Sequence, residues 1–468
     1  MSPARTSRKS ASRSGDSAPG QLLPEAEVRR IIEKILRLAK SIGAEETEVH
    51  LDETASSLTR FANNAVHQNV AEHGLHVSIR TVADNRTARV TTNRLDEDSL
   101  RAAIEASLSL AHSQPKDAGL LPLPGKQTYR KMSRFVAATA ALTPEDRARA
   151  VRRACDFAIE RGQVAAGIFS SSQTQTAVGN ARGLFAAYRD THATFSITMQ
   201  QGSAASWAKT NAAGVHDIGP QKLAQRASEK AQMATDAREL APGRYTVILE
   251  PAAVLDLVGF LFYDFAATAL HDKRSCFNER MGKPLFGKEI TITDDVYHPL
   301  QLGAPFDGEG MPRQRVVLVE RGVPKNLVYA RRSAKAAGKK PTGHGFALPN
   351  EYGEAPMNLV FSGGGASLEE MIASTDRGLL VTRLWYIREV DPYEKVMTGM
   401  TRDGLFFVEN GRITSAVRNF RFNQSVLEML RNVEMLGPAV RATGEEAFEM
   451  VVPAMKVRSF HFSEVTKF

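Results

Sequence analysis

Two carboxylates separated by a single glycine, Asp307 and Glu309 in the run PFDGEG, have the spacing in this sequence that best suits chemistry. Acids at that spacing can divide the roles of general acid and general base, or hold a cation. A solvated turn before a strand explains the same pattern. With His344, in the run PTGHGF, and Asp256, they form the set that an independent hydrolase would use.

Zinc ligands and catalytic nucleophiles do not form a recognisable motif in this sequence. No His-Glu-x-x-His is present, and the pairs His73/His76 and His271/Cys276 each lack the further ligands that a four-coordinate zinc needs. Gly-x-Ser-x-Gly is also absent, and Cys155 lies too far from Cys276 for a Cys-x-x-Cys site. The residues alone therefore predict neither a metal centre nor a covalent nucleophile.

The composition is that of an ordinary globular protein. The chain has 468 residues, of which 43% are hydrophobic and 24% charged. The most apolar stretch, residues 252–270, is interrupted by Asp256 and Asp264, so we expect no membrane span. Two cysteines far apart in the sequence favour a reducing compartment, and we expect a cytoplasmic protein.

The net charge of +8 is concentrated in two short segments. Residues 1–22 are rich in serine and arginine and predict a disordered basic tail. The second run, residues 331–340, has no interleaved aromatic residues and is typical of a solvated helix end. Nucleic acid is therefore not an expected partner, and a nucleic-acid-associated role stays as an alternative that rests on charge alone.

The first half of the chain repeats one order of elements. An amphipathic helix from Pro24, three strand-like runs and a helix over 96–111 are followed by the same order from Thr143 to 234. Thr143 and Asp146 predict a capping box at the second start. We therefore predict an α+β domain over residues 23–240, with two lobes of helices and antiparallel strands that arose by internal duplication.

The second half, residues 241–468, reads as a β-rich domain that begins after the linker Ala241-Pro242-Gly243. Asn410-Gly411 predicts a tight hairpin. Two long helices are expected near 252–270 and 423–434. Ser367 and Glu370 fit a capping box better than a phosphate-binding loop, because the lysine of a Walker motif is missing.

The stretch FDGEG at 306–310, the run VLVERGVPKNLVYARRSAKAAG and the run TGHG at 342–345 resemble the TldD/TldE (PmbA) family of modulator-of-gyrase, metallopeptidase-related proteins. The segments KRSCFNERMGKPLFGKEITITDD and GLFFVENG resemble it too. The resemblance implies an amino-terminal α+β domain and a barrel-like carboxy-terminal domain. It also suggests six substrate or interface residues, which are Asp307, Glu309, Gly310, Thr342, Gly343 and His344.

The active TldD branch of that family carries His-Glu-x-x-x-His on a helix, with zinc on the histidines. The matching positions here are Leu255, Asp256 and Phe260, and two of them are hydrophobic. The resemblance therefore implies the metal-free TldE (PmbA) branch, with no catalytic residue and no bound metal in this chain. It implies a heterodimer with a zinc-bearing TldD-like subunit that degrades or trims unfolded peptides; self-association and an independent hydrolase are the alternatives.

Overall fold

The structure is a computed structural model, and it describes residues 21–445 and 447–466. Most of the predicted basic tail lies outside the described residues. Leu22, the last residue of the predicted tail, is only 5% exposed.

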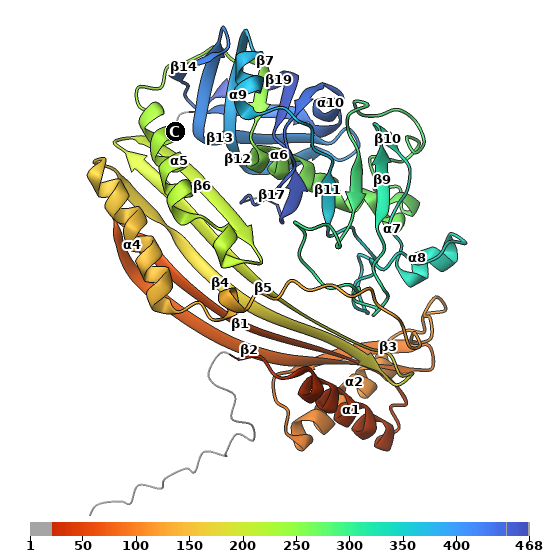
Figure 1. Cartoon of the computed structure of the whole chain (residues 1–468). Coiled ribbons are helices and arrows are strands. Elements are labelled where there is room, and N and C mark those ends of the chain that lie inside the picture. The colour runs from red at the N-terminus through yellow and green to blue at the C-terminus, as the bar shows by residue number, and fades with distance from the viewer. Residues whose placement is uncertain (1–20, 446, 467–468) are drawn as a thin grey trace, which may run out of the picture.

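One long antiparallel sheet dominates the amino-terminal half, where alternating sequence patterns favour strands. Its six strands lie in the order β3-β2-β1-β4-β5-β6. They run over Glu46–Ala62 (β1), Ala65–Ala83 (β2), Arg86–Thr92 (β3), Val164–Asn180 (β4), Phe185–Gln201 (β5) and Ala204–Ala212 (β6). In Figure 1 these strands curve beneath the carboxy-terminal half of the chain.

Two helix pairs cover opposite ends of the same face of this sheet. Helices α1 (Glu25–Ser41) and α2 (Glu97–Ser113) share a core with Val49 and Leu51 of β1. Helices α4 (Pro144–Glu160) and α5 (Pro220–Met233) share a second core with Phe61 of the same strand. Since residues two apart on a strand point to one face, both cores lie on one side. Figure 1 shows α1 and α2 at one end and α4 at the other.

The same order, helix, three strands, helix, therefore occurs twice, as the internal duplication predicts. The two units are joined by β1 and β4, which pair antiparallel from Glu48 opposite Asn180 to Phe61 opposite Gly167. The predicted capping box is present, because Thr143 accepts from the Asp146 amide and Asp146 from the Thr143 amide.

The carboxy-terminal half contains a closed barrel, as the resemblance implies. Its ring runs β12-β7-β19-β15-β13 and closes through the pairing of β12 with β13. The strands are Gly243–Leu249 (β7), Arg377–Asp391 (β12), Val396–Glu409 (β13), Phe420–Ser425 (β15) and Met455–Val465 (β19). Strands β14 (Arg412–Ala416) and β16 (Val433–Leu436) pair with its members.

A second sheet of short strands lies beside the barrel in the order β10-β9-β8-β11-β18-β17. The strands are Ile292–Asp294 (β8), Val316–Glu320 (β9), Val323–Pro324 (β10), Leu359–Phe361 (β11), Val440–Ala442 (β17) and Met450–Val452 (β18). The chain from β8 to β11 contains the predicted site residues, together with the short helix α8 (Arg331–Ala336).

Both long helices expected in this half are wrong in length. The first is the α-helix α6 (Pro251–Val258), followed by a 3-10 segment, Gly259–Phe265, and α7 (Ala267–His271). The second, α10, covers only Val426–Arg431, because the residues before it pair as β15. The predicted hairpin at Asn410 joins β13 to β14, and Ser367 caps α9 (Leu368–Ala373) as predicted.

Among the described residues, no helix is both long and apolar enough to cross a membrane.

Candidate functional site

Helix α6 carries Leu255 and Asp256, and the 3-10 segment after it carries Phe260; these are the three positions that the resemblance matches to a zinc motif. The helix begins at Pro251, whose fixed φ suits the first helical position, and the N-cap residue before it, Glu250, is buried. Leu255 and Asp256 are completely buried, as a core position requires. Phe260 is only partly buried and packs against the core from its margin.

The chain between β17 and β18 lies directly on this helix. A Cβ atom on Gly444 would stand 2.1 Å from Oδ1 of Asp256, and one on Gly259 would stand 2.5 Å from Cβ of Ala447. Glycines at 444 and 259 are therefore needed for this close approach. The place beside Asp256 is filled by protein.

Leu255 and Phe260 do not fit a zinc ion, because a hydrocarbon side chain has no lone pair to donate. Within residues 21–445 and 447–466, no group of three or more histidine, cysteine, aspartate or glutamate side chains is arranged to hold a metal ion. Both cysteines, Cys155 and Cys276, are buried, and burial raises the pKa of the Cys155 thiol to about 11. Neither thiol is poised as a nucleophile.

The turn at 306–311 is buried, and the solvated turn that we considered for Asp307 and Glu309 is therefore wrong. Asp307 is 4% exposed and accepts three backbone hydrogen bonds, from Glu309 at 2.9 Å, Met311 at 2.8 Å and Gly345 at 2.7 Å. Burial nevertheless raises its pKa. Its carboxylate is used to fold the turn and to fasten it to the 342–345 loop.

His344 is also part of the buried framework. Its Nε2 lies 2.8 Å from Oδ1 of Asp294, and its Nδ1 lies 2.9 Å from Oγ1 of Thr342. Thr342 in turn accepts from the Tyr329 amide at 2.7 Å. Gly343 has φ +72°, and a Cβ there would stand 2.2 Å from the Pro312 carbonyl oxygen, so the position requires glycine.

Glu309 faces the start of helix α8. Its Oε1 accepts from the Arg331 amide at 2.9 Å, and the Arg331 guanidinium lies 3.7 Å from Oε2. Burial, together with repulsion from Asp307, raises the pKa of Glu309 to about 7, although Arg331 acts against the shift. A Cβ on Gly345 would stand 2.4 Å from Oε1 of Glu309, so the backbone at 345 can come this close to the carboxylate only because the residue is glycine.

Charged side chains of the long sheet lie where the sheet meets the carboxy-terminal half. Arg80 donates to both oxygens of Glu48 at 3.1 Å each, and Arg89 donates to Glu48 at 2.8 Å. Arg89 also donates to the Leu348 carbonyl at 2.6 Å, which joins the sheet to the carboxy-terminal half. Near Gly310, the Tyr129 hydroxyl donates to the Gly310 carbonyl at 2.7 Å.

The structure thus brings together all six candidates of the 307–310 and 342–344 segments. It buries five of them at the joint between the two halves and leaves Thr342 half-buried. Asp256 belongs to a separate place, on α6 against Gly444. Asp294, the partner of His344, was not among the predicted residues. Its position at the end of the run ITITDD is the one signal that could have found it, because an acid next to a buried strand needs a partner.

Glu309 predicts a specific pH dependence of stability. A carboxyl group whose pKa rises from 4.5 to about 7 on folding favours the protonated form, so its contribution is lost as the pH rises through that range. The loss has an upper value of about 3 kcal/mol. In Glu309→Gln the free energy of unfolding should fall less between pH 5 and 8, by urea denaturation. Glu320→Gln, on an exposed strand residue, is the control, and an unchanged pH profile in Glu309→Gln would contradict the assignment.

Comparisons with known proteins identify the family. Residues 242–464 match the model of the PmbA/TldA metallopeptidase C-terminal domain, and residues 48–111 match that of PmbA/TldA metallopeptidase domain 1. Metalloprotease PmbA of Escherichia coli O157:H7 is 22% identical over 403 residues, covering 81% of this chain and 85% of that protein. The uncharacterized protein MJ0231 of Methanocaldococcus jannaschii is 29% identical over 167 residues, and the matched part of this chain spans only 39% of that protein.

The solved structure of TldE from Thermococcus kodakarensis has the same fold. It superposes with a TM-score of 0.84 at 21% sequence identity, and the match covers 92% of this chain and all of that one. The chain belongs to the PmbA/TldD family.

Proposed function

We propose that this chain is the metal-free, TldE-like subunit of a TldD/TldE-type zinc metallopeptidase that degrades or trims unfolded peptides in the cytoplasm. In this proposal the chain binds no metal and cleaves no peptide alone. The zinc and the general base belong to a TldD-like subunit that pairs with it.

The observation that carries the proposal is the burial of the side chains on α6. Leu255 is fully buried at a position where the family's active branch has a metal ligand, and the chain at Gly444 fills the place beside Asp256. Hydrolysing an amide near neutral pH requires an activated water or a nucleophile. The burial and hydrogen bonding of Asp307 and His344 argue against their use as a second catalytic set.

Metal analysis and a mixing experiment test the proposal. The purified chain should contain no stoichiometric zinc after mild purification, and it should not cleave an unstructured peptide. Cleavage should appear when a subunit with His-Glu-x-x-x-His is added, and it should disappear when the first histidine of that motif is replaced by alanine.

Asp256→Asn in this chain is the matched variant, because it keeps the size of the side chain where Gly444 leaves no room for a larger one. It should change cleavage by the mixture by less than about threefold, which corresponds to less than 1 kcal/mol. About one zinc per chain that resists a weak chelator would overturn the proposal. Loss of turnover in Asp256→Asn with assembly intact would favour an independent hydrolase instead.

A further inference from the structure

Five aromatic side chains form one continuous strip in the carboxy-terminal half. Phe448 packs against Phe262 with ring centroids 5.3 Å apart, and Phe262 lies 6.2 Å from Tyr263. Tyr263 lies 6.3 Å from Tyr352, and Tyr352 lies 6.5 Å from Phe346. None of the five side chains is fully buried, and Tyr352 is 63% exposed. We call these five residues the aromatic strip.

The strip is assembled from three segments that are far apart in the sequence. Phe262 and Tyr263 belong to the 3-10 segment after α6, Phe346 and Tyr352 to the loop between α8 and β11, and Phe448 to the chain between β17 and β18. The Tyr263 hydroxyl donates to the Tyr352 carbonyl at 3.1 Å, which holds two of the segments together. The fold thus gathers the rings into one contiguous, partly exposed surface, and such a surface is typical of a binding site.

The strip lies on the side of the carboxy-terminal half that contacts the long sheet. Next to one end of the strip, Glu449 accepts from Asn211 of β6 at 3.0 Å. Near the other end, the Leu348 carbonyl accepts from Arg89 of β3 at 2.6 Å. Strands β6 and β3 are the two edge strands of the sheet. A ligand on the strip would therefore lie near the junction of the two halves.

The spacing of the rings fits an extended peptide. Neighbouring ring centroids along the strip are 5.3–6.5 Å apart. An extended chain rises about 3.3 Å per residue and its side chains alternate between two sides, so side chains on one side are about 6.6 Å apart. Aromatic and large aliphatic side chains at alternate positions of such a peptide can each contact a neighbouring ring of the strip.

The charge on the strip favours an apolar ligand over an anionic one. Arg274 places its guanidinium 5.6 Å from the Tyr263 ring centroid. The same guanidinium donates to Asp272 at 2.8 Å, so its charge is offset by a carboxylate. Binding of nucleic acid or another polyanion depends on cations that are free to contact it. An extended apolar segment is therefore the ligand that the strip fits best.

We propose that the aromatic strip binds the unfolded peptide substrate through its apolar side chains, and so selects peptides with aromatic or large aliphatic residues at alternate positions. The inference rests on the proposed function, in which cleavage belongs to a zinc-bearing subunit, and it gives the metal-free chain the task of holding the peptide. Folded proteins bury most of these side chains in their cores, so the strip favours unfolded chains.

Peptide binding by the purified full chain tests the inference, because it requires no zinc-bearing subunit. The probe is a fluorescein-labelled unstructured decapeptide with phenylalanine and leucine at alternate positions, and its companion has serine at those positions. The apolar peptide should bind at least about tenfold more tightly by fluorescence anisotropy. Tyr352→Ala should weaken its binding at least about fivefold, whereas Tyr352→Phe, which keeps the ring, should bind within about twofold of the unchanged chain.

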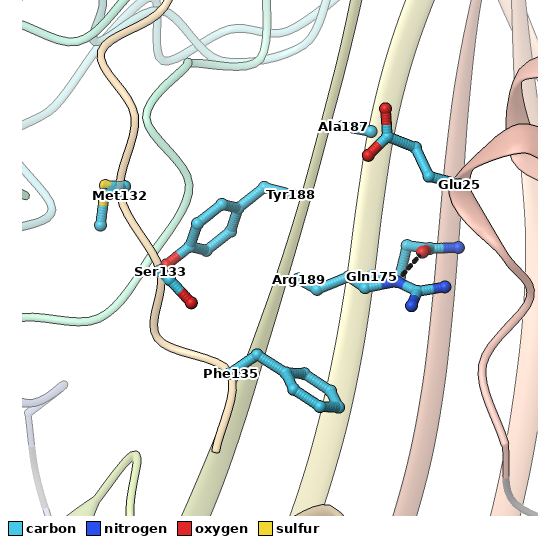
Figure 2. A pocket seen from close by; sticks show the side chains of 8 residues that line it. All are labelled: Glu25, Met132, Ser133, Phe135, Gln175, Ala187, Tyr188 and Arg189. Carbon is cyan, nitrogen blue, oxygen red and sulfur yellow. Dashed lines mark hydrogen bonds between the residues drawn. The ribbon is translucent and has the colours of Figure 1, made fainter. Parts of the chain in front are cut away.

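Two variants outside the strip are matched controls. Tyr386→Ala removes a tyrosine of similar exposure, 54%, from β12. Phe135→Ala removes an aromatic side chain that is 37% exposed and lines a separate cavity beside β5, as Figure 2 shows. No residue of the strip lines that cavity. Both variants should bind the apolar peptide within about twofold of the unchanged chain.

Kinetics of the mixture with a zinc-bearing subunit give a second measurement. Tyr352→Ala should raise KM for the apolar peptide at least about fivefold and leave kcat within about twofold, because it removes an interaction made before the chemical step. The serine peptide should show no such change. A substitution that only disturbed the fold would instead lower the melting temperature and affect both peptides equally.

Three results would overturn the inference: a chain that binds the apolar and serine peptides equally, equal loss of binding in Tyr352→Ala and Tyr386→Ala, or a Tyr352→Ala chain that binds peptide normally but no longer assembles with the zinc-bearing subunit. The last result would make the strip a subunit contact. If the chain alone binds the apolar peptide through Tyr352 but its mixtures cleave nothing, the strip is confirmed and the proposed function is wrong.

Discussion

Lys230→Met is expected to destabilise the protein by about 3–5 kcal/mol, the typical loss when one partner of a buried ion pair is removed. Lys230 on α5 is 9% exposed and pairs with Glu250, which is 2% exposed and directly precedes α6. Its ammonium also donates to Thr382 at 3.1 Å. Glu250 forms salt bridges with both Lys230 and Arg226, so the variant would leave it buried with only the Arg226 salt bridge. Urea denaturation at pH 7 measures the loss.

Arg226→Met provides a matched control, because it removes the other cation that binds the same carboxylate. The Arg226 side chain is 47% exposed, so water can replace it, and its loss should be about 1 kcal/mol or less. Lys230→Met/Glu250→Gln should recover much of the stability by removing the uncompensated charge. If Lys230→Met were no more destabilising than Arg226→Met, the pair would not fasten α5 to the start of α6.

His344→Ala should cost about 3 kcal/mol or more, since it leaves the buried Asp294 carboxylate without the side chain that hydrogen-bonds it. Both side chains are 1% exposed or less. Burial alone would raise the pKa of Asp294, but attraction to His344 and their hydrogen bond outweigh it and lower the pKa. A carboxyl group with a depressed pKa stabilises the fold at neutral pH, and that contribution is lost as the pH falls below about 4.

This variant also separates a structural role from a catalytic one. His271→Ala, at a side chain that is 85% exposed, is the control and should change stability by less than about 0.5 kcal/mol. Asp294→Asn/His344→Ala should be more stable than His344→Ala alone. If a His344→Ala chain kept its melting temperature but abolished peptide cleavage by its mixture with a zinc-bearing subunit, His344 would instead be a functional residue.

The organisation of the chain could largely be predicted from sequence, because local patterns decide it. The helix starts at Thr143 and Ser367 and the hairpin at Asn410 depend on a few neighbouring residues, and each is present. The order helix, three strands, helix, which occurs twice, could be predicted for the same reason. The fold class, α+β with a barrel-like second half, is confirmed.

The burial of the candidate site could not be predicted, because it depends on contacts between distant segments. Asp307 in a glycine-rich run has the local pattern of a surface turn, yet its carboxylate accepts from Gly345, thirty-eight residues later. The pair of Asp294 and His344 spans fifty residues and has no fixed spacing. The helix near 423 was overestimated because pairing of β15 with two neighbouring strands outweighs helix propensity there.

The join between β1 and β4 has a consequence for how the protein is made. Glu48 pairs with Asn180, 132 positions later, and β4 begins 118 positions after β1. At synthesis rates of about 5–20 residues per second, β1 leaves the ribosome roughly 6–24 seconds before β4. During that interval the first unit can form its own helices and hairpin, but the side of β1 that belongs to β4 stays open. Neighbouring nascent chains on one messenger RNA would present the same open strand, so the cell's chaperones have a defined window in which to keep them apart.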